Sequence, residues 1–256
     1  MCRFLGYIGP PVDLNSLLFL PEYSLNRQSY NPRFQRFGTI NADGFGVGWY
    51  DLSIRDQPAR YRTTKPMWSD SSFQNIAGLI SSGVVLGIVR SATPPLPVDE
   101  SYTQPFTNSK WLFAHNGAVE DFIGEKGKIF RDYVQKTSSW RQEGGSDSEV
   151  LFSLCLSYLL NGTSLSQSLI QTLSIASEIC GGRFNMVISD GKNLSATAWG
   201  DSLYLLEEAG PSKQGRVLAS EPYDNNPSWR QIQDRTLVEL NHQSVEIASI
   251  NLESLG

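Results

Sequence analysis

The sequence predicts an α+β fold, a layered sandwich in which helices cover two antiparallel sheets. Strand-like segments open the chain, capped helices occupy its middle, and extended segments with hairpin turns return after residue 182. Sheets built in this way have apolar faces that helices must cover. The chain has 256 residues, 40% of them hydrophobic, and no long linker divides it, so we expect one domain over residues 1–256.

The first half of the chain combines strands with one helix. Phe73, Ile76 and Ile80 recur at helical spacing after the capping residues Ser69 and Asp70. The last long apolar run before the proline-rich stretch 93–100 is typical of a strand buried on both faces. The expected strands are, in order, 3–9, 46–50, 59–64, 84–90 and 111–117.

Two helices are expected in the middle of the chain. Ser146 stands three residues before Glu149, a capping-box spacing that opens an apolar stripe over 146–160, and helical character continues over 164–180. Beyond them, Asp190-Gly191 separates two extended runs, which is a hairpin signal. Further extended segments are expected at 202–208, 215–222, 235–241 and 244–250.

Charge and hydropathy exclude several classes of partner. The net charge is −5 and the pI about 5.1, which argues against non-specific binding to nucleic acid. No apolar run approaches the roughly 20 residues that span a bilayer. The start of the chain lacks the apolar core of a secretory signal. We therefore expect a cytoplasmic protein that contacts neither nucleic acid nor membrane, with the oligomeric state, including a homo-oligomer, left open.

The few cysteines and histidines limit which kinds of disulfide and metal site the chain could form. The three cysteines form no CxxC motif and no even set, which suits reduced thiols better than a disulfide framework. His115 and His242 are the only histidines, so a histidine-rich metal site is excluded. We expect chemistry without a metal or an organic cofactor.

Cys2 is the most informative single residue, because only Met1 precedes it. Removal of Met1 would place a thiol and a free α-amine on one residue. Unperturbed amines of this kind titrate at about 7.7–8.0, so the amine could act as the base that activates the thiol. Alone, a cysteine near the start of a chain is more often incidental.

Three further segments carry polar groups at the ends of secondary structure. Arg90 closes an apolar strand, where a guanidinium can bind a carboxylate through two hydrogen bonds or form a structural ion pair. Asn116 and Gly117 leave a strand, as an ordinary turn or as an oxyanion hole. Asp147 lies at a helix N-terminus, as a capping group or as a ligand for an ammonium. His115 fits a packed strand residue better than a reacting group.

Together the four segments resemble the class II glutamine amidotransferases, which carry Cys2, RSAT, HNG and SDSE in this order and approximate spacing. The resemblance implies the four-layer α/β/β/α sandwich of the N-terminal nucleophile hydrolase fold. It also implies that Cys2 is the nucleophile and that Asn116 and Gly117 form the oxyanion hole. Arg90 and Asp147 would bind the α-carboxylate and α-ammonium of a glutamyl group.

The match to the family is not complete. Thr93 resembles a supporting contact after the arginine. Ile88-Val89 stands where many members carry His-Thr, and Phe4 stands where close relatives often carry histidine. These differences leave the expected glutamyl site intact but alter its walls.

Segments 25–50 and 217–240 resemble the γ-glutamyl hydrolases of the ergothioneine pathway. That resemblance implies a small-molecule substrate, γ-glutamyl-hercynylcysteine S-oxide, cleaved through a Cys2 thioester to glutamate and hercynylcysteine S-oxide. Three alternatives remain: a glutaminase subunit that supplies ammonia to a separate synthase, a generic γ-glutamyl hydrolase, and a binding protein without activity.

The trimethylammonium group of that substrate would favour an aromatic face. Tyr30, Trp49, Trp68 and Trp229 lie in or near loops and are candidates for it, although each could equally serve packing. Arg183 and Glu221 are weaker candidates for residues that approach the site, because the strands after the middle helices could return beside it.

Overall fold

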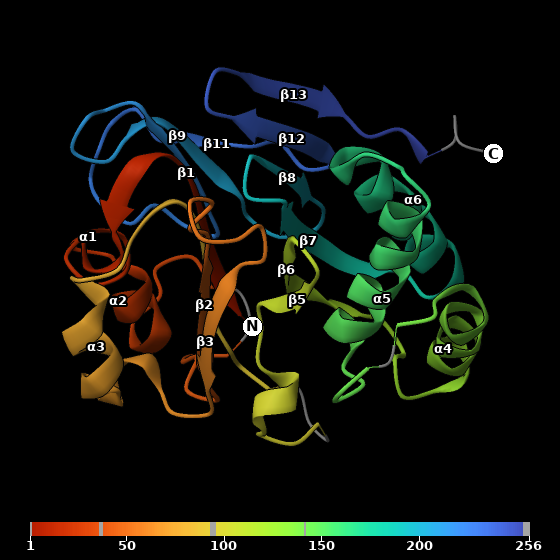
Figure 1. Cartoon of the computed structure of the whole chain (residues 1–256). Helices are drawn as coiled ribbons and strands as arrows, with labels where there is room; N and C mark the ends of the chain where they lie inside the picture. Colours follow the sequence, from red (N-terminus) through yellow and green to blue (C-terminus); the bar gives the residue numbers. More distant parts are fainter. Residues whose placement is uncertain (1, 36–37, 93–95, 141, 253–256) are drawn as a thin grey trace.

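The computed structural model describes residues 2–35, 38–92, 96–140 and 142–252 of the chain (Figure 1). The helices, with two short 3₁₀ turns η1 and η2, are α1 (Leu14–Leu18), α2 (Leu25–Tyr30), η1 (Met67–Ser69), α3 (Ser71–Ala77), η2 (Glu100–Tyr102), α4 (Glu125–Thr137), α5 (Asp147–Leu160) and α6 (Leu165–Ile179). No helix among these described residues is both long and apolar enough to cross a membrane.

The strands form two sheets, and every pair of neighbouring strands in them is antiparallel. Sheet A has seven strands in the order β11-β9-β10-β1-β4-β2-β3, and sheet B has six in the order β13-β12-β8-β7-β6-β5. The strands are β1 (Arg3–Asp13), β2 (Phe45–Trp49), β3 (Ala59–Thr63), β4 (Ser81–Val89), β5 (Phe106–Asn108), β6 (Trp111–Val119), β7 (Gly182–Ser189), β8 (Asn193–Ala198), β9 (Tyr204–Ala209), β10 (Gly215–Ala219), β11 (Arg230–Gln231), β12 (Thr236–Asn241) and β13 (Val245–Ser249).

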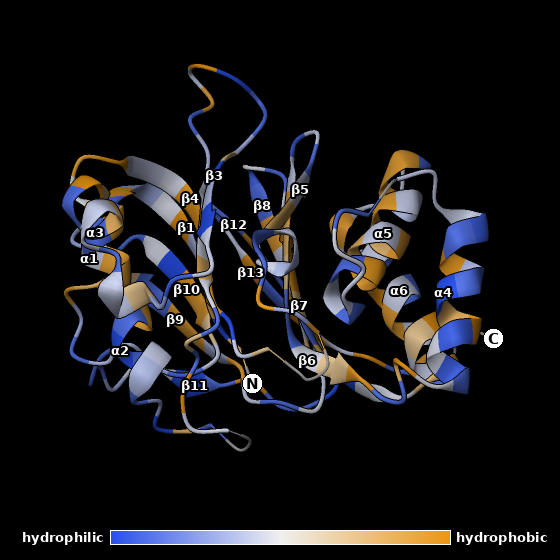
Figure 2. Cartoon of the chain, turned by 90° about the horizontal axis from the view of Figure 1, so that it is seen from below, coloured by the Kyte–Doolittle hydropathy of each residue, from blue (hydrophilic) through white to orange (hydrophobic). Residues whose placement is uncertain are grey.

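The elements stack as four layers, as the fold class predicted. Figure 2 shows the two sheets facing each other, with α1–α3 on the outer side of sheet A and α4–α6 on the outer side of sheet B. The alternation of side chains along β1 fits this arrangement: Phe4 and Ile8 belong to the core between the sheets, whereas Leu5 and Tyr7 pack in the core beneath α1–α3.

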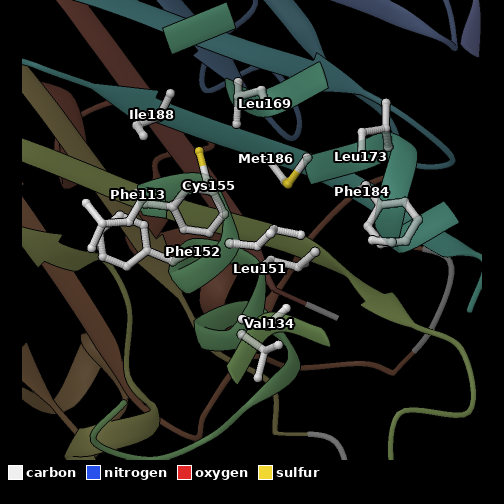
Figure 3. Close-up of a cluster of buried hydrophobic side chains, with 14 of the residues drawn as sticks. Phe113, Val134, Leu151, Phe152, Cys155, Leu169, Leu173, Phe184, Met186 and Ile188 are labelled. Atoms are coloured by element: carbon white, nitrogen blue, oxygen red, sulfur yellow. The ribbon is translucent and has the colours of Figure 1, made fainter. Parts of the chain in front are cut away.

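The third core lies between sheet B and the long helices. Figure 3 shows Phe113 of β6 and Ile188 of β7 on one side and Phe152 and Cys155 of α5 on the other. Phe113 and Phe152 stack with ring centroids 5.2 Å apart. Since α5 is buried around most of its circumference, its position against sheet B is strongly determined, and so is the position of its N-terminus.

Most sequence expectations hold, with local corrections. The hairpin at Asp190-Gly191 joins β7 to β8, as predicted. The helix after Asp70 is shorter than expected, because it ends at Ala77 and leaves Ile80 outside it. The cap of α5 also differs: Ser146 accepts from Glu149 N, but the Glu149 side chain accepts from the backbone of residues 143–145 instead of closing a capping box.

Helices α1, α2 and α4 were not foreseen. The first two have five and six residues, too short to leave a clear periodic pattern. Their apolar side chains pack against the outer face of sheet A, and they include Leu14, Leu18 and Leu25. Helices this short are stable mainly through such packing, which a single segment of sequence does not reveal.

Candidate active site

The site is built where β1 begins and β4 ends. Arg3 pairs with Val89, so Cys2 lies beside Arg90 and Ser91 across the two central strands of sheet A. The half-buried Cys2 thiol is 3.9 Å from the Ser91 carbonyl oxygen. A cavity of about 240 Å³ opens here, and four residues predicted from the sequence line it: Cys2, Arg90, Gly117 and Asp147.

Arg90 is buried, and no acidic residue in the described part of the chain forms an ion pair with it. Its guanidinium donates to the backbone carbonyls of Asp43 (3.4 Å) and Pro97 (2.9 Å), and its side chain lies near the Tyr102 ring. Burial lowers the pKa of Arg90, while Cys2, Asp43 and Asp147 act in the opposite direction. Within the described residues no carboxylate lies within ion-pair distance of Arg90, so its charge is available to an anionic ligand.

Asp43 shapes the loop around Arg90. Its backbone N–H donates to the Arg90 carbonyl at 3.0 Å, and its side chain accepts from Ala92 N at 2.7 Å. The glycines of the segment 41–50 were expected to let the backbone pass close to a ligand. At Gly44, a Cβ would approach Thr63 O to 2.6 Å and φ is +119°, so this position favours glycine. The expected contact of Thr93 lies outside the described residues.

Gly117 lies inside β6, which continues to Val119, so the expectation that Asn116 and Gly117 leave the strand in a turn is wrong. At this point β6 closely approaches β7. An added Cβ would come within 2.0 Å of the Arg183 carbonyl oxygen, so only glycine fits without separating the strands. Asn116 beside it is fully buried and does not line the cavity. Its Nδ2 donates a long hydrogen bond of 3.4 Å to Ser220 Oγ, and Ser220 Oγ also accepts from Phe4 N at 3.0 Å.

Asp147 is the first residue of α5 and reaches back to β6. One of its carboxylate oxygens accepts from Val119 N at 3.1 Å, and the other accepts from Ser148 N at 2.8 Å. Ser146, not Asp147, caps the helix, so the simple capping interpretation of Asp147 is wrong. The carboxylate therefore faces the cavity at a position that both the helix and the strand fix.

His115 is a buried strand residue that connects two walls of the cavity. Nε2 lies 2.9 Å from Arg183 O and Nδ1 lies 2.9 Å from Ser148 Oγ. A carbonyl only accepts, so Nε2 carries the proton and Nδ1 accepts from the Ser148 hydroxyl. Burial lowers the pKa of His115, which favours this neutral form. Gln104 completes the arrangement by bonding both backbone groups of His115.

The sequence did not indicate several of these supporting residues. Gln104, Ser148 and Ser220 act through contacts between segments distant in the chain, and only Ser148 stood inside a recognised motif. Glu221 does not line the cavity. It lies 3.8 Å from Arg3 in a fully buried ion pair and accepts from the backbone of residues 33 and 34.

The four aromatic candidates for a cation site do not line the cavity. Tyr30 and Trp68 contact each other edge to face on the surface, with ring centroids 5.6 Å apart. Trp49 packs beneath α1–α3, and Trp229 donates to Asp224. Packing therefore accounts for these side chains. In the described part of the chain, no group of three or more histidine, cysteine or acidic residues is placed to hold a metal ion.

The chain resembles known proteins in sequence and in fold. The family model "Glutamine amidotransferases class-II" matches residues 22–209. The chain is 36% identical over 251 residues to a γ-glutamyl-hercynylcysteine sulfoxide hydrolase of Mycobacterium tuberculosis, covering 98% of this chain and 97% of that protein.

Two solved structures share the fold. A glutamine aminotransferase class-II domain protein from Silicibacter pomeroyi aligns with a TM-score of 0.67 at 25% identity, over 97% of this chain and 99% of that one. Glutamine phosphoribosylpyrophosphate amidotransferase from Bacillus subtilis aligns with a TM-score of 0.69 at 15% identity, over 98% of this chain and 49% of that one.

Proposed function

The chain belongs to the class II glutamine amidotransferases, and we propose that it hydrolyses the γ-glutamyl amide of γ-glutamyl-hercynylcysteine S-oxide. The products are glutamate and hercynylcysteine S-oxide. The observation that supports this type of reaction is the cavity that Cys2, Arg90 and Asp147 line together. The substrate follows from the near full-length likeness to the mycobacterial hydrolase.

The glutamyl half of the substrate would be held at its charged end. Arg90 would bind the α-carboxylate and Asp147 the α-ammonium, because each is a buried or half-buried charge that faces the cavity. Thr93 would support the contact at Arg90. Fixing one end in this way places the γ-carbonyl carbon at the sulfur, and such positioning can contribute about 7–11 kcal/mol in ideal cases.

Cys2 would act as the nucleophile once Met1 has been removed. Its thiolate attacks the γ-carbonyl, with its own α-amine as the base that takes the thiol proton. Gly117 N–H and the Asn116 side-chain amide would stabilise the oxyanion. Asn116 does not line the cavity, so its amide would have to exchange its long 3.4 Å bond to Ser220 for one to the oxyanion.

Collapse of the tetrahedral intermediate completes the first half of the reaction. The C–N bond breaks, the α-ammonium of Cys2 donates its proton to the departing nitrogen, and a γ-glutamyl thioester remains. Water, deprotonated by the same amine, then attacks the thioester. Glutamate leaves and the thiol is regenerated, so the cycle needs no cofactor.

The setting of the activity is part of the proposal. The reaction is that of one domain over residues 1–256 on a small-molecule substrate, without nucleic acid or membrane, and with a homo-oligomer as one possible assembly. We assign it to the cytoplasm, where Cys2, Cys155 and Cys180 would stay reduced, as suits their free state in the structure.

The test compares glutamate release from the sulfoxide substrate and from glutamine, after mass spectrometry has verified that Cys2 is N-terminal. We expect a large preference for the sulfoxide and its loss in Cys2→Ala. Cys155→Ala is the matched control, because burial raises the pKa of the Cys155 thiol to about 12 and keeps it unreactive. Preference for glutamine would instead indicate a glutaminase subunit, and turnover of neither compound would contradict the hydrolase.

A further inference from the structure

A second arginine, Arg183, lines the cavity, and the mechanism above leaves it without a role. Cys2, Arg90 and Asp147 line the same cavity. Arg90 follows β4 of sheet A, whereas Arg183 belongs to β7 of sheet B, so the two arginines stand on different walls. With one carboxylate among these lining residues, the cavity is suited to a ligand that carries more than one anionic group.

The backbone of Arg183 is fixed against the strand that would hold the oxyanion. Arg183 pairs with Ala118 on β6, directly beside Gly117. Its carbonyl accepts from His115 Nε2 at 2.9 Å and occupies the space that a side chain at position 117 would need. The backbone contacts that fix the position of Gly117 therefore also fix the Cα atom from which the Arg183 side chain extends.

The side chain is oriented by a dedicated acidic partner. Arg183 Nε donates to Asp201 Oδ2 at 3.0 Å, with the side chain of Arg183 30% exposed and that of Asp201 1% exposed. Gly200 leaves room for the aliphatic stem: its φ is +89°, and a Cβ there would come within 2.8 Å of Arg183 Cγ. The buried carboxylate thus fixes the Nε edge of the guanidinium, on a residue that lines the cavity and whose side chain stays partly exposed.

The loop that carries Asp201 is itself anchored in the core of sheet B. Asn185, which pairs with Asn116, accepts from Trp199 N at 2.8 Å and donates to Asp201 O at 3.0 Å. Asn185 is fully buried. A rigidly built arginine with a buried partner at a cavity wall is the arrangement that recognises a planar anion.

We propose that Arg183 binds the α-carboxylate of the amine that leaves, and so selects γ-glutamyl compounds whose leaving group is an α-amino acid. This inference rests on the proposed γ-glutamyl hydrolysis. In such a substrate one carboxylate lies at the glutamyl end and a second lies two bonds from the scissile nitrogen. Two guanidiniums on different walls of the Cys2 cavity match this pair. Glutamine, whose leaving group is ammonia, offers Arg183 nothing.

Two substrate pairs that differ only at this carboxylate test the inference. The first pair is the sulfoxide substrate and its analogue with the cysteinyl carboxylate converted to a carboxamide. The second is γ-glutamylalanine and γ-glutamylethylamide. We expect the wild-type KM to be about tenfold or more lower for the carboxylate member, the range of a hydrogen bond to a charged group, with little change in kcat.

Variants at position 183 test whether Arg183 causes the KM difference within each substrate pair. Arg183→Gln should remove most of the KM difference within each pair, and Arg183→Lys should retain part of it because the charge remains without the planar fork. Arg55→Gln is the control, since the Arg55 side chain donates to Pro58 O in its own loop and does not line the cavity. Thermal unfolding of each variant separates loss of the contact from loss of the fold.

The outcomes distinguish this inference from the proposed function. If the wild type hydrolyses these compounds without a preference within either pair, the role of Arg183 is wrong and the hydrolase stands. An equal loss on both members in Arg183→Gln would place Arg183 at the glutamyl half and also overturn the inference. Hydrolysis of none of the four compounds would count against the proposed function itself.

Discussion

Arg90 and Arg183 line one cavity but are held in opposite ways. Arg90 is 6% exposed, and within the described residues its guanidinium donates to backbone carbonyls, whereas Arg183 is more exposed and donates to the buried carboxylate of Asp201. Burial lowers the pKa of Arg90, so its folded state bears an unfavourable desolvation. Under the roles proposed here, the arginine that every γ-glutamyl substrate would contact has no carboxylate partner among the described residues, and the arginine that only some substrates would contact already has one.

The largest expected effect tests the Arg90 side of this comparison. Arg90→Gln should lower kcat/KM by roughly 100- to 1,000-fold for glutamine and for the sulfoxide substrate alike, because both carry the same glutamyl α-carboxylate. The free protein should lose little stability, since a buried charge without a carboxylate partner is removed. Steady-state kinetics and thermal unfolding measure both.

A loss of activity confined to some substrates in Arg90→Gln would contradict the role assigned to Arg90. If the variant lost only substrates with an amino-acid leaving group, Arg90 and Arg183 would have to exchange their assigned ends of the substrate. The control is again Arg55→Gln, which removes an exposed arginine from a loop outside the cavity.

Gly117→Ala should disturb both walls together. The new methyl group would meet Arg183 O at 2.0 Å and His115 Nε2 at 2.5 Å, so β6 and β7 must separate. We expect a stability loss of about 1–3 kcal/mol, as for an overpacked core, and a loss of activity on all substrates. Chemical denaturation and the two-substrate assay measure these effects.

Gly78→Ala provides the matched control for that substitution. Gly78 follows α3 with φ −73°, and nothing lies within 4 Å of a Cβ built there. Its replacement should leave activity unchanged and alter stability by at most about 1 kcal/mol, in the stabilising direction. Gly117→Ala with normal stability and activity would show that the two walls are not rigidly joined at this point.

The smallest expected effect concerns His115, which connects the two walls. Burial lowers its pKa in the folded state, so the unfolded chain takes up the proton first, at about pH 6.5. The stability contributed by the neutral ring is present above that pH and is lost as the pH falls, by up to about 1.4 kcal/mol per unit. The stability advantage of the wild type over His115→Gln should therefore shrink between pH 6.5 and 5.

Denaturant unfolding at several pH values measures this difference. His242→Gln is the control, because His242 lies exposed in the turn between β12 and β13, away from the cavity. A His115→Gln variant whose stability runs parallel to the wild type would mean that His115 is protonated in the folded protein and that the assigned tautomer is wrong.

Local patterns predicted much of the framework. Three features depend on interactions within about four residues, which the sequence shows directly. They are the caps of α5 and α6, the Asp190-Gly191 hairpin and the apolar run of β4. The motifs with Cys2, Arg90, Gly117 and Asp147 were also visible, and the cavity brings these four residues together. Their chemical roles stay predictions that the variants above address.

Other features depended on contacts between distant segments. The aromatic candidates were chosen from loop position alone, yet Trp49 packs in a core and Tyr30 contacts Trp68 outside the cavity. Arg183 was only a weaker candidate, named because its strand follows the middle helices, and the cavity lining includes it. Asp201 meets it from 18 positions later in the chain, because β7 and β8 run antiparallel and the loop after β8 returns beside the start of β7.

The order of the elements, the α+β class and the polar residues of the site were all visible in local sequence patterns. Contacts between distant segments set the surroundings of the charged groups: among the described residues Arg90 has no carboxylate partner and Arg183 pairs with Asp201, while burial between the two walls lowers the pKa of His115. The reason is physical. Capping and periodicity are short-range properties of the chain, whereas desolvation and ion pairing depend on which distant segments fold against each other.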